Sequence, residues 1–107
     1  MTKVIGLIKV LDSEAFVTYR SQVGETVIKH GGVITYRGSE TRLLWNELGV
    51  DDFEACVEIE FPSADAANQW ANSPEYQSLL AVRSKAMRLT LFVTNSQNKN
   101  PSAKAGV

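Results

Sequence analysis

The stretch that decides the fold runs from residue 55 to residue 77 and reads ACVEIEFPSADAANQWANSPEYQ. Within it, residues 55–61 alternate Ala, Val, Ile and Phe with Cys, Glu and Glu. This two-residue period predicts a β-strand with one face against a core. Pro62 ends the strand because it cannot donate a backbone hydrogen bond. Ser63 then offers an acceptor to the first turn of a helix, so a strand followed directly by a helix is expected here.

A second helix start lies within the same stretch, at Ser73-Pro74-Glu75. Serine is a favourable N-cap, proline fits the first helical position, and an acidic side chain there opposes the helix dipole. We therefore predict a helical segment over about residues 74–85. Residues 87–93 alternate apolar with polar or aromatic side chains and are expected to form the last strand.

The sequence before this stretch predicts another strand and helix. Residues 4–11 are rich in β-branched and aliphatic side chains, which favours a strand. Asp12 or Ser13 can cap the helix that follows, and Gly31-Gly32 can end it, since glycine adopts the left-handed C-cap conformation without a steric penalty. Large side chains recur between them at steps of three and four residues, so they share the face that meets the sheet: Phe16, Tyr19, Val23, Val27 and His30.

The remaining strand is expected over residues 33–40. A regular alternation there places Arg37 on the side of the sheet opposite Tyr36. The apolar run at residues 43–45 can continue this strand beyond an irregular Gly-Ser step, and residues 46–52 are expected to form the turn.

The predicted order is strand, helix, strand, strand, helix, strand. This order is typical of the ferredoxin-like βαββαβ fold, an α+β architecture with a four-stranded antiparallel sheet and helices on one face. The domain is expected to span residues 1–94. Residues 95–107, which lack a large apolar side chain before Val107, are expected to be a disordered tail. Because the first strand is apolar on both sides, the uncovered sheet face predicts a homodimer with facing sheets.

Composition limits the possible partners and cofactors. The chain has 11 basic and 12 acidic residues, a balance that argues against nucleic acid as a partner. With one cysteine and one histidine, no metal site is expected, and no cofactor is expected because the sequence has neither a Gly-rich phosphate loop nor a CxxC motif. No stretch approaches the ~20 apolar residues of a membrane-spanning helix, so a membrane partner is not expected either. The single cysteine fits a reducing compartment, and the cytoplasm is the expected location.

Several motifs in this sequence occur together in a known family. They are EFPSADAA at residues 60–67 followed by Trp70, SPEYQ at 73–77, Gly31-Gly32, and Tyr-Arg-Gly at 36–38, together with the aromatic pair Phe16 and Tyr19. Over about residues 3–94 the chain resembles the domain-of-unknown-function 1330 family. The resemblance implies membership of the dimeric α+β barrel superfamily, whose members hold small aromatic or polyketide substrates in a cleft between helices and sheet. The family name records no activity.

Two residues are candidates for acid–base or anion chemistry. His30 has the only side chain whose ordinary pKa suits proton transfer near neutral pH, although a packing role at a helix end is the alternative. Arg37 has a planar guanidinium that can bind a carboxylate or enolate, or can instead pair with Glu58 or Glu60 across the sheet. Glu60 itself interrupts an apolar strand, which is typical of a paired or functional carboxylate.

Four further side chains complete the predicted ligand-binding set. Tyr19, Trp70 and Tyr76 are core aromatic residues or the walls of a cleft, and their polar atoms need partners when buried. Arg83 is a further partner for a carboxylate such as Glu60.

These residues leave two functions open. The first is a cofactor-independent enzyme that carries out proton transfer, isomerisation or monooxygenation on a small organic molecule. The second is a non-catalytic dimeric module that binds such a molecule without converting it.

Overall fold

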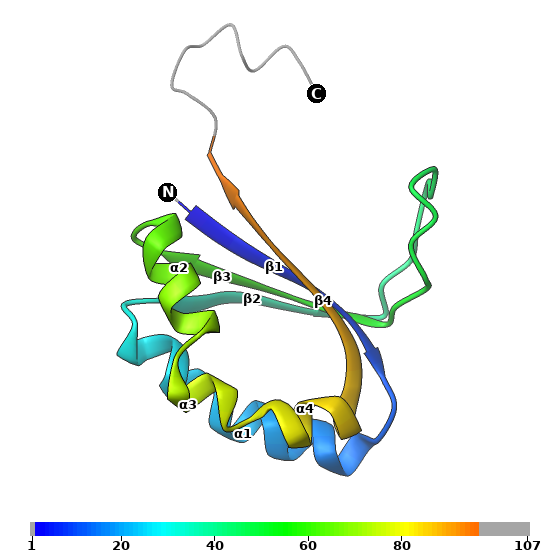
Figure 1. Cartoon of the computed structure of the whole chain (residues 1–107). Helices are drawn as coiled ribbons and strands as arrows, with labels where there is room; N and C mark the ends of the chain where they lie inside the picture. The colour runs from blue at the N-terminus through cyan, green and yellow to red at the C-terminus, as the bar shows by residue number, and fades with distance from the viewer. Residues whose placement is uncertain (1, 97–107) are drawn as a thin grey trace, which may run out of the picture.

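The computed structural model describes residues 2–96 of the chain (Figure 1). The elements follow the predicted order and are β1 (Thr2–Val10), α1 (Ser13–Lys29), β2 (Val33–Ser39), β3 (Ala55–Phe61), α2 (Ala64–Ala71), α3 (Pro74–Gln77), α4 (Leu80–Ala86) and β4 (Met87–Asn95). The predicted tail begins at Asn95, but this residue belongs to β4, where it pairs with Thr2. Residues 97–107 lie outside the described part of the chain.

The four strands form one antiparallel sheet in the order β2-β3-β1-β4. All four helices lie on one face of this sheet, with α1 alongside α3 and α4 (Figure 1). The fold is therefore the predicted ferredoxin-like α+β architecture with helices on one face. The two central strands, β1 and β3, place their side chains alternately toward the helices and toward the other face.

The predicted helix starts are formed by side-chain caps. Asp12 accepts a hydrogen bond from the backbone N–H of Ala15 at 3.0 Å, and Ser63 accepts one from the N–H of Ala66 at 3.1 Å. Ser73 caps the N-terminus of α3 in the same way. Gly31 follows α1 with a φ of 79°, the left-handed conformation expected for a glycine C-cap.

Two sequence-based expectations are wrong in detail. The helix predicted over residues 74–85 is interrupted, because the backbone N–H of Leu79 bonds to the carbonyl of Tyr76, three residues earlier, and tightens the turn between α3 and α4. The strand predicted to continue through residues 43–45 ends at Ser39, where pairing with β3 stops. Residues 40–54 leave the sheet as a long loop, which we call the arm.

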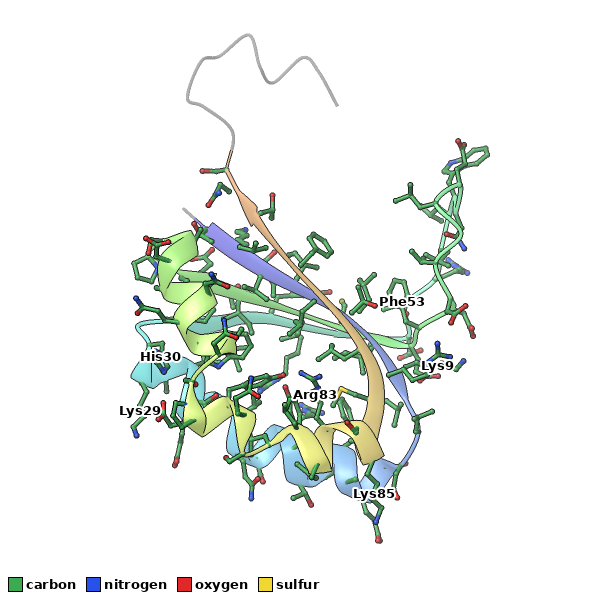
Figure 2. The ribbon with its side chains drawn as sticks, in the orientation of Figure 1. Lys9, Lys29, His30, Phe53, Arg83 and Lys85 are labelled. Carbon is green, nitrogen blue, oxygen red and sulfur yellow. The ribbon has the colours of Figure 1, made fainter. Side chains whose placement is uncertain are left out.

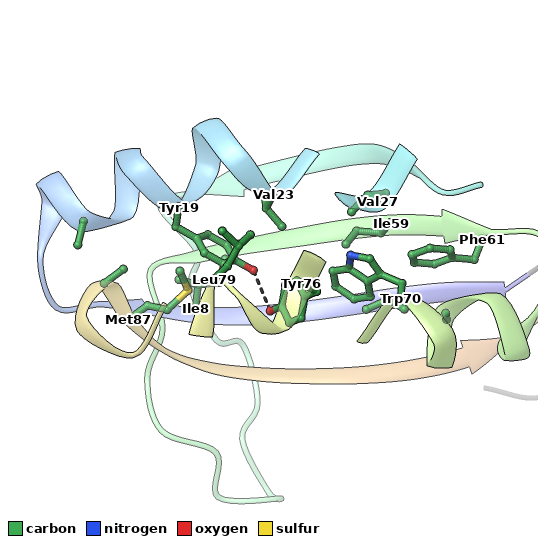
Figure 3. Packing of buried hydrophobic residues seen from close by; sticks show 14 residues of the cluster. Ile8, Tyr19, Val23, Val27, Ile59, Phe61, Trp70, Tyr76, Leu79 and Met87 are labelled. Atoms are coloured by element: carbon green, nitrogen blue, oxygen red, sulfur yellow. Dashed lines mark hydrogen bonds between the residues drawn. The ribbon is translucent and has the colours of Figure 1, made fainter. Parts of the chain in front are cut away.

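The core lies between the sheet and the helices (Figure 3). Its largest fully buried side chains are Trp70, Tyr76, Phe61 and Val27. The ring of Trp70 packs 4.5 Å from that of Tyr76 and 5.5 Å from that of Phe61, measured between centroids. The core thus joins α1 and β3 to the α2–α3 segment, and it fills the helix side of the sheet toward the α2 end.

None of the helices in residues 2–96 covers the opposite side of the sheet, which we call the bare face. Strand alternation and register place two aliphatic side chains of β1, Ile5 and Leu7, on this face. Tyr36 and Phe92 lie on the same face and are 59% and 46% exposed. The apolar character predicted for both sides of the first strand is therefore present.

Candidate functional site

A cavity of about 230 Å³ lies between α1 and the sheet. Its walls are mainly apolar and aromatic, and they include Phe16, Tyr19, Ile34, Val57, Trp70 and Leu91. Three polar side chains contribute at its edge: Arg20 from α1, and Arg37 and Ser39 from β2. A hollow with apolar walls and a few polar groups is the usual form of a small-molecule site.

A β-bulge in β2 determines which side of the sheet Arg37 occupies. Ile34 pairs with Ile59, but the next paired residue, Tyr36, lies opposite Glu58, so Thr35 is an extra residue in β2. Beyond the bulge, Arg37 lies opposite Val57 and shares its face, which is the face of the cavity. Without the bulge, alternation would have placed Arg37 on the bare face.

The two arginines at the cavity have no anionic partner. Among residues 2–96, no ion pair or side-chain hydrogen bond involves Arg37. Arg20 likewise has no ion pair or side-chain hydrogen bond within the described residues, and its guanidinium lies 5.5 Å from the ring centroid of Phe16. Of the two interpretations left open for Arg37, pairing with Glu58 or Glu60 is not observed, because the bulge puts Arg37 on the opposite face of the sheet from both carboxylates, which pair with Lys3. Two guanidinium groups are thus available at the cavity.

A hydrogen-bonded chain of three residues ends in the cavity wall. Arg83 donates from Nη1 to the hydroxyl of Tyr76 at 2.9 Å, and the hydroxyls of Tyr76 and Tyr19 are 2.9 Å apart (Figure 3). Burial raises the pKa of Tyr19 well above its ordinary value, and the neighbouring Tyr76 raises it further. Tyr19 is therefore protonated at neutral pH, and it can serve as a hydrogen-bond donor or acceptor but not as a base.

The orientation of Trp70 is determined by a second buried chain. Its indole N–H donates to Thr26 Oγ1 at 2.9 Å, and that hydroxyl donates to the carbonyl of Val23 at 2.7 Å. Both partners belong to α1. This arrangement satisfies the buried indole and holds the ring against the cavity.

His30 lies outside the cavity. Its Nε2 is 3.1 Å from a carboxylate oxygen of Glu75, at the end of α1 and beside α3, and it does not line the cavity (Figure 2). The hydrogen bond with His30 lowers the pKa of Glu75, so this carboxylate is ionised at neutral pH. The predicted acid–base role of His30 is therefore not part of the function proposed below.

The structure divides the predicted site residues into three groups. Tyr19, Arg37 and Trp70 line the cavity, while Tyr76 and Arg83 reach it through the hydroxyl of Tyr19. Glu60 and His30 are not among the residues that line the cavity, and their ionic partners are Lys3 and Glu75. Glu60 pairs with Lys3 on the bare face, at 3.7 Å.

Sequence reasoning missed Arg20. The signal available was its position one helical turn after Phe16, on the same side of α1 as the predicted inner face.

The described part of the chain shows no cluster of three side chains of the kinds that ligate metals. Nor does any helix within residues 2–96 combine the length and the apolar character needed to cross a bilayer.

Comparison with known proteins supports the fold. Residues 4–96 match the family model described as a domain of unknown function, DUF1330. A search of curated proteins finds no match.

Solved structures with the same fold are distant in sequence. A protein of unknown function from Rhodopseudomonas palustris has a TM-score of 0.73 at 17% identity, covering 91% of this chain and 82% of that one. SnoaB, a cofactor-independent oxygenase from Streptomyces nogalater, has a TM-score of 0.63 at 11% identity, covering 94% and 96%. A dimeric ferredoxin-like protein of unknown function from Bacteroides fragilis has a TM-score of 0.53 at 15% identity, covering 89% and 95%.

Proposed function

Because the chain belongs to the DUF1330 family, whose name assigns no activity, we propose a function from its own cavity: it binds a small aromatic or otherwise apolar organic anion between α1 and the sheet. The observation that carries this proposal is the bulge at Thr35, which turns an unpaired Arg37 toward an apolar cavity. Bulges commonly re-aim a side chain beside a functional site.

The size and the walls of the cavity favour a ligand of one or two rings. Its volume of about 230 Å³ is below the range of roughly 300–1,000 Å³ that is typical of sites for drug-sized molecules. A dry apolar cavity of about 150 Å³ is enough to bind benzene. The faces of Phe16, Tyr19 and Trp70 provide the surfaces on which a ring can pack.

The guanidinium groups favour a negative charge on the ligand. Arg20 and Arg37 are on the cavity rim, and their side chains are exposed in the free protein. A planar guanidinium binds a carboxylate or enolate through two parallel hydrogen bonds. The ligand would thus place its rings inside and its anionic group at the rim, and the hydroxyl of Tyr19 would donate to a polar atom deeper in the cavity.

The test compares matched probes by calorimetry and thermal shift. Salicylate and 2-naphthoate carry a carboxylate, and salicylamide and 2-naphthamide are their uncharged counterparts. We expect a preference for the carboxylates that is lost in Arg37→Gln. A hydrogen bond to a charged group is worth about 1.5–3 kcal/mol, so the variant should weaken carboxylate binding by roughly 10-fold to 150-fold.

The control variant is Arg42→Gln, which removes a guanidinium from the arm and does not line the cavity. It should bind all four probes as the wild type does. Equal affinity for carboxylates and amides in the wild type, or an equal loss in both variants, would contradict the proposal.

A second candidate is conversion of the bound molecule without a cofactor. The observation that favours it is the Arg37 guanidinium at the cavity, because such a group can stabilise an enolate or phenolate, the ionised form of a substrate that can isomerise or react with dioxygen. SnoaB, described as a cofactor-independent oxygenase, shares the fold at 11% identity. The side chain of Tyr19 cannot supply the base, because its pKa is raised, so the substrate would need to ionise readily by itself.

Oxygen uptake separates the two candidates. A panel of hydroxynaphthoates that bind in the calorimetric screen would be incubated with the protein in air, with Arg37→Gln as the comparison. Uptake that depends on Arg37 and yields an oxidised product supports an oxygenase. Tight binding without oxygen uptake and without an isomerised product supports a protein that binds the molecule and does not convert it.

We also propose that the chain is a homodimer through its bare face. Ile5 and Leu7 lie on this face with Tyr36 and Phe92, and leaving several such side chains in water costs about 1.5–3 kcal/mol each. The B. fragilis protein of the same fold is described as dimeric. Light scattering after size-exclusion chromatography at micromolar concentration is the test, and elution at monomer mass would contradict it.

A further inference from the structure

The most exposed large apolar side chains of the described residues are gathered at the tip of the arm. Leu44, Trp45 and Leu48 are 83%, 85% and 94% exposed. Leu43 and Val50 beside them are also exposed. A tryptophan and several leucines held in water on one loop are unusual on a monomer and mark an interaction surface.

The arm has a defined conformation in spite of this exposure. At its tip, the side-chain amide of Asn46 donates to the carbonyl of Val50 at 2.8 Å and accepts from the N–H of Val50 at 3.0 Å. At its base, Lys9 pairs with Asp52 at 3.3 Å and Arg88 with Asp51 at 3.2 Å. The apolar tip is thus presented on a framework with its own hydrogen bonds and ion pairs.

We propose that the arm clasps a second copy of this chain, with Trp45 and Leu48 as the main contacts. The inference builds on the homodimer proposed above and adds the element that holds the dimer together. The arm leaves the sheet between the end of β2 and the start of β3 and projects on the side opposite the helices, which is the side of the bare face (Figure 1). A two-fold axis through facing sheets would bring each arm against the partner, because such an axis pairs each surface with its own copy.

The apolar area is sufficient for this partner. A fully exposed aromatic side chain offers roughly 150–250 Å² and an aliphatic one about 60–120 Å², so the exposed apolar side chains of the arm and bare face together offer on the order of 600 Å². A standard interface buries about 800 Å² per subunit, of which about 65% is apolar in homodimers. The bare face without the arm would fall well short of this.

The charges also favour a second copy. On the bare face, Lys3 is paired with Glu58 and Glu60, and at its border Lys9 and Arg88 are paired with residues of the arm. A face whose charges are paired in this way can meet its own copy without the repulsion that a single-sign face would cause.

Other occupants fit less well. Acidic residues outnumber the single Arg42 along the arm, which opposes binding to an anionic membrane surface. The sequence of residues 97–107 has no large apolar side chain before Val107, so its composition offers little apolar surface to a tryptophan and two leucines. A groove at the base of the arm, lined by Leu7, Val50 and Phe53, offers space for side chains of a second copy.

The experiment measures the dimer dissociation constant by sedimentation velocity. The double variant Trp45→Ala/Leu48→Ala removes two side chains that are almost fully exposed in the monomer, so its fold should be intact, as far-UV circular dichroism would confirm. Residues that dominate interfaces cost at least ~2 kcal/mol each when truncated, so we expect the dissociation constant to rise by about 100-fold or more. Trp45→Phe keeps most of the apolar area and should stay within about 10-fold of the wild type.

The matched control is Ile28→Ala, which removes a 71% exposed aliphatic side chain from α1 on the helical side of the molecule. It should leave the dissociation constant unchanged. A dimer that the arm variants do not weaken would overturn the clasp and leave the homodimer standing. A monomeric wild type would overturn both, and co-flotation of that monomer with vesicles of phosphatidylcholine and phosphatidylglycerol would identify a membrane as the occupant.

Discussion

The paired hydroxyls of Tyr19 and Tyr76 should make unequal and non-additive contributions to stability. In Tyr19→Phe, the Tyr76 hydroxyl keeps Arg83 as its partner, so only one buried hydrogen bond is lost. We expect this variant to lower the free energy of unfolding by about 1 kcal/mol. In Tyr76→Phe, the guanidinium loses its acceptor and the buried Tyr19 hydroxyl loses its partner, so we expect a loss of about 2–4 kcal/mol.

The double variant tests the reasoning. Once Tyr76 is phenylalanine, the hydroxyl of Tyr19 is buried without a partner, and removing it should cost nothing further. The double variant should therefore be about as stable as Tyr76→Phe alone, with a coupling energy of about 1 kcal/mol or more. Because Tyr19 lines the cavity and Tyr76 does not, Tyr19→Phe is also the variant expected to weaken ligands that accept a hydrogen bond there.

Urea unfolding at one fixed protein concentration is the assay, since dimerisation makes the midpoint concentration-dependent. With a slope of about 1–3 kcal/mol per molar urea, a loss of 2–4 kcal/mol is readily resolved. If the double variant equals the sum of the single variants to within about 0.3–0.5 kcal/mol, the two hydroxyls do not act as a pair.

Two further predictions concern backbone packing and pH. Gly32→Ala places a Cβ 2.6 Å from a ring carbon of Phe61 and should lower the free energy of unfolding by about 1–3 kcal/mol. Gly24 is a helix-interior glycine with open space around it, so Gly24→Ala should raise the free energy of unfolding by roughly 0.5–1 kcal/mol. Urea midpoints measure both changes. The pKa of Glu75 is lowered from 4.5 by its hydrogen bond with His30, so the stability it contributes is present above that value and is lost as the pH falls through the lower folded-state value. Glu75→Gln should therefore be less stable than the wild type near neutral pH, with the difference shrinking below about pH 4.5, and an undiminished difference in acid would contradict this.

The parts of the fold that were predicted correctly depend on interactions between residues that are close together in the sequence. The strand at residues 55–61 has its predicted bounds because its alternation needs only a core on one side. The caps predicted at Ser63 and Ser73 are confirmed, and of the two candidates Asp12 and Ser13 the cap is Asp12; each side chain bonds to a backbone N–H three residues later. Such local rules require no knowledge of the rest of the chain.

The arm could not be predicted in this way. Its apolar run at residues 43–45 has the composition of a strand, but a strand also needs a neighbour to bond with, and the pairing of β2 with β3 ends at Ser39 opposite Ala55. The apolar composition of residues 43–45 predicts buried side chains. This prediction holds only if a second molecule covers them. The break between α3 and α4 could not be predicted from the sequence either, because it arises from a single tightened turn at Leu79.

The position of Arg37 shows most directly why the site could not be assigned from the sequence. Regular alternation gives Arg37 the same face as Glu58 and Glu60, where a salt bridge is its natural role. One extra residue, Thr35, whose hydroxyl bonds to the carbonyl and carboxylate of Glu58, shifts the register and moves Arg37 to the cavity. Lys3 pairs with both carboxylates on the bare face, whereas Arg37, on the cavity side, has no ionic partner among residues 2–96. The bulge therefore decides whether Arg37 can form a structural salt bridge on the bare face or is available to the ligand that we propose for the cavity.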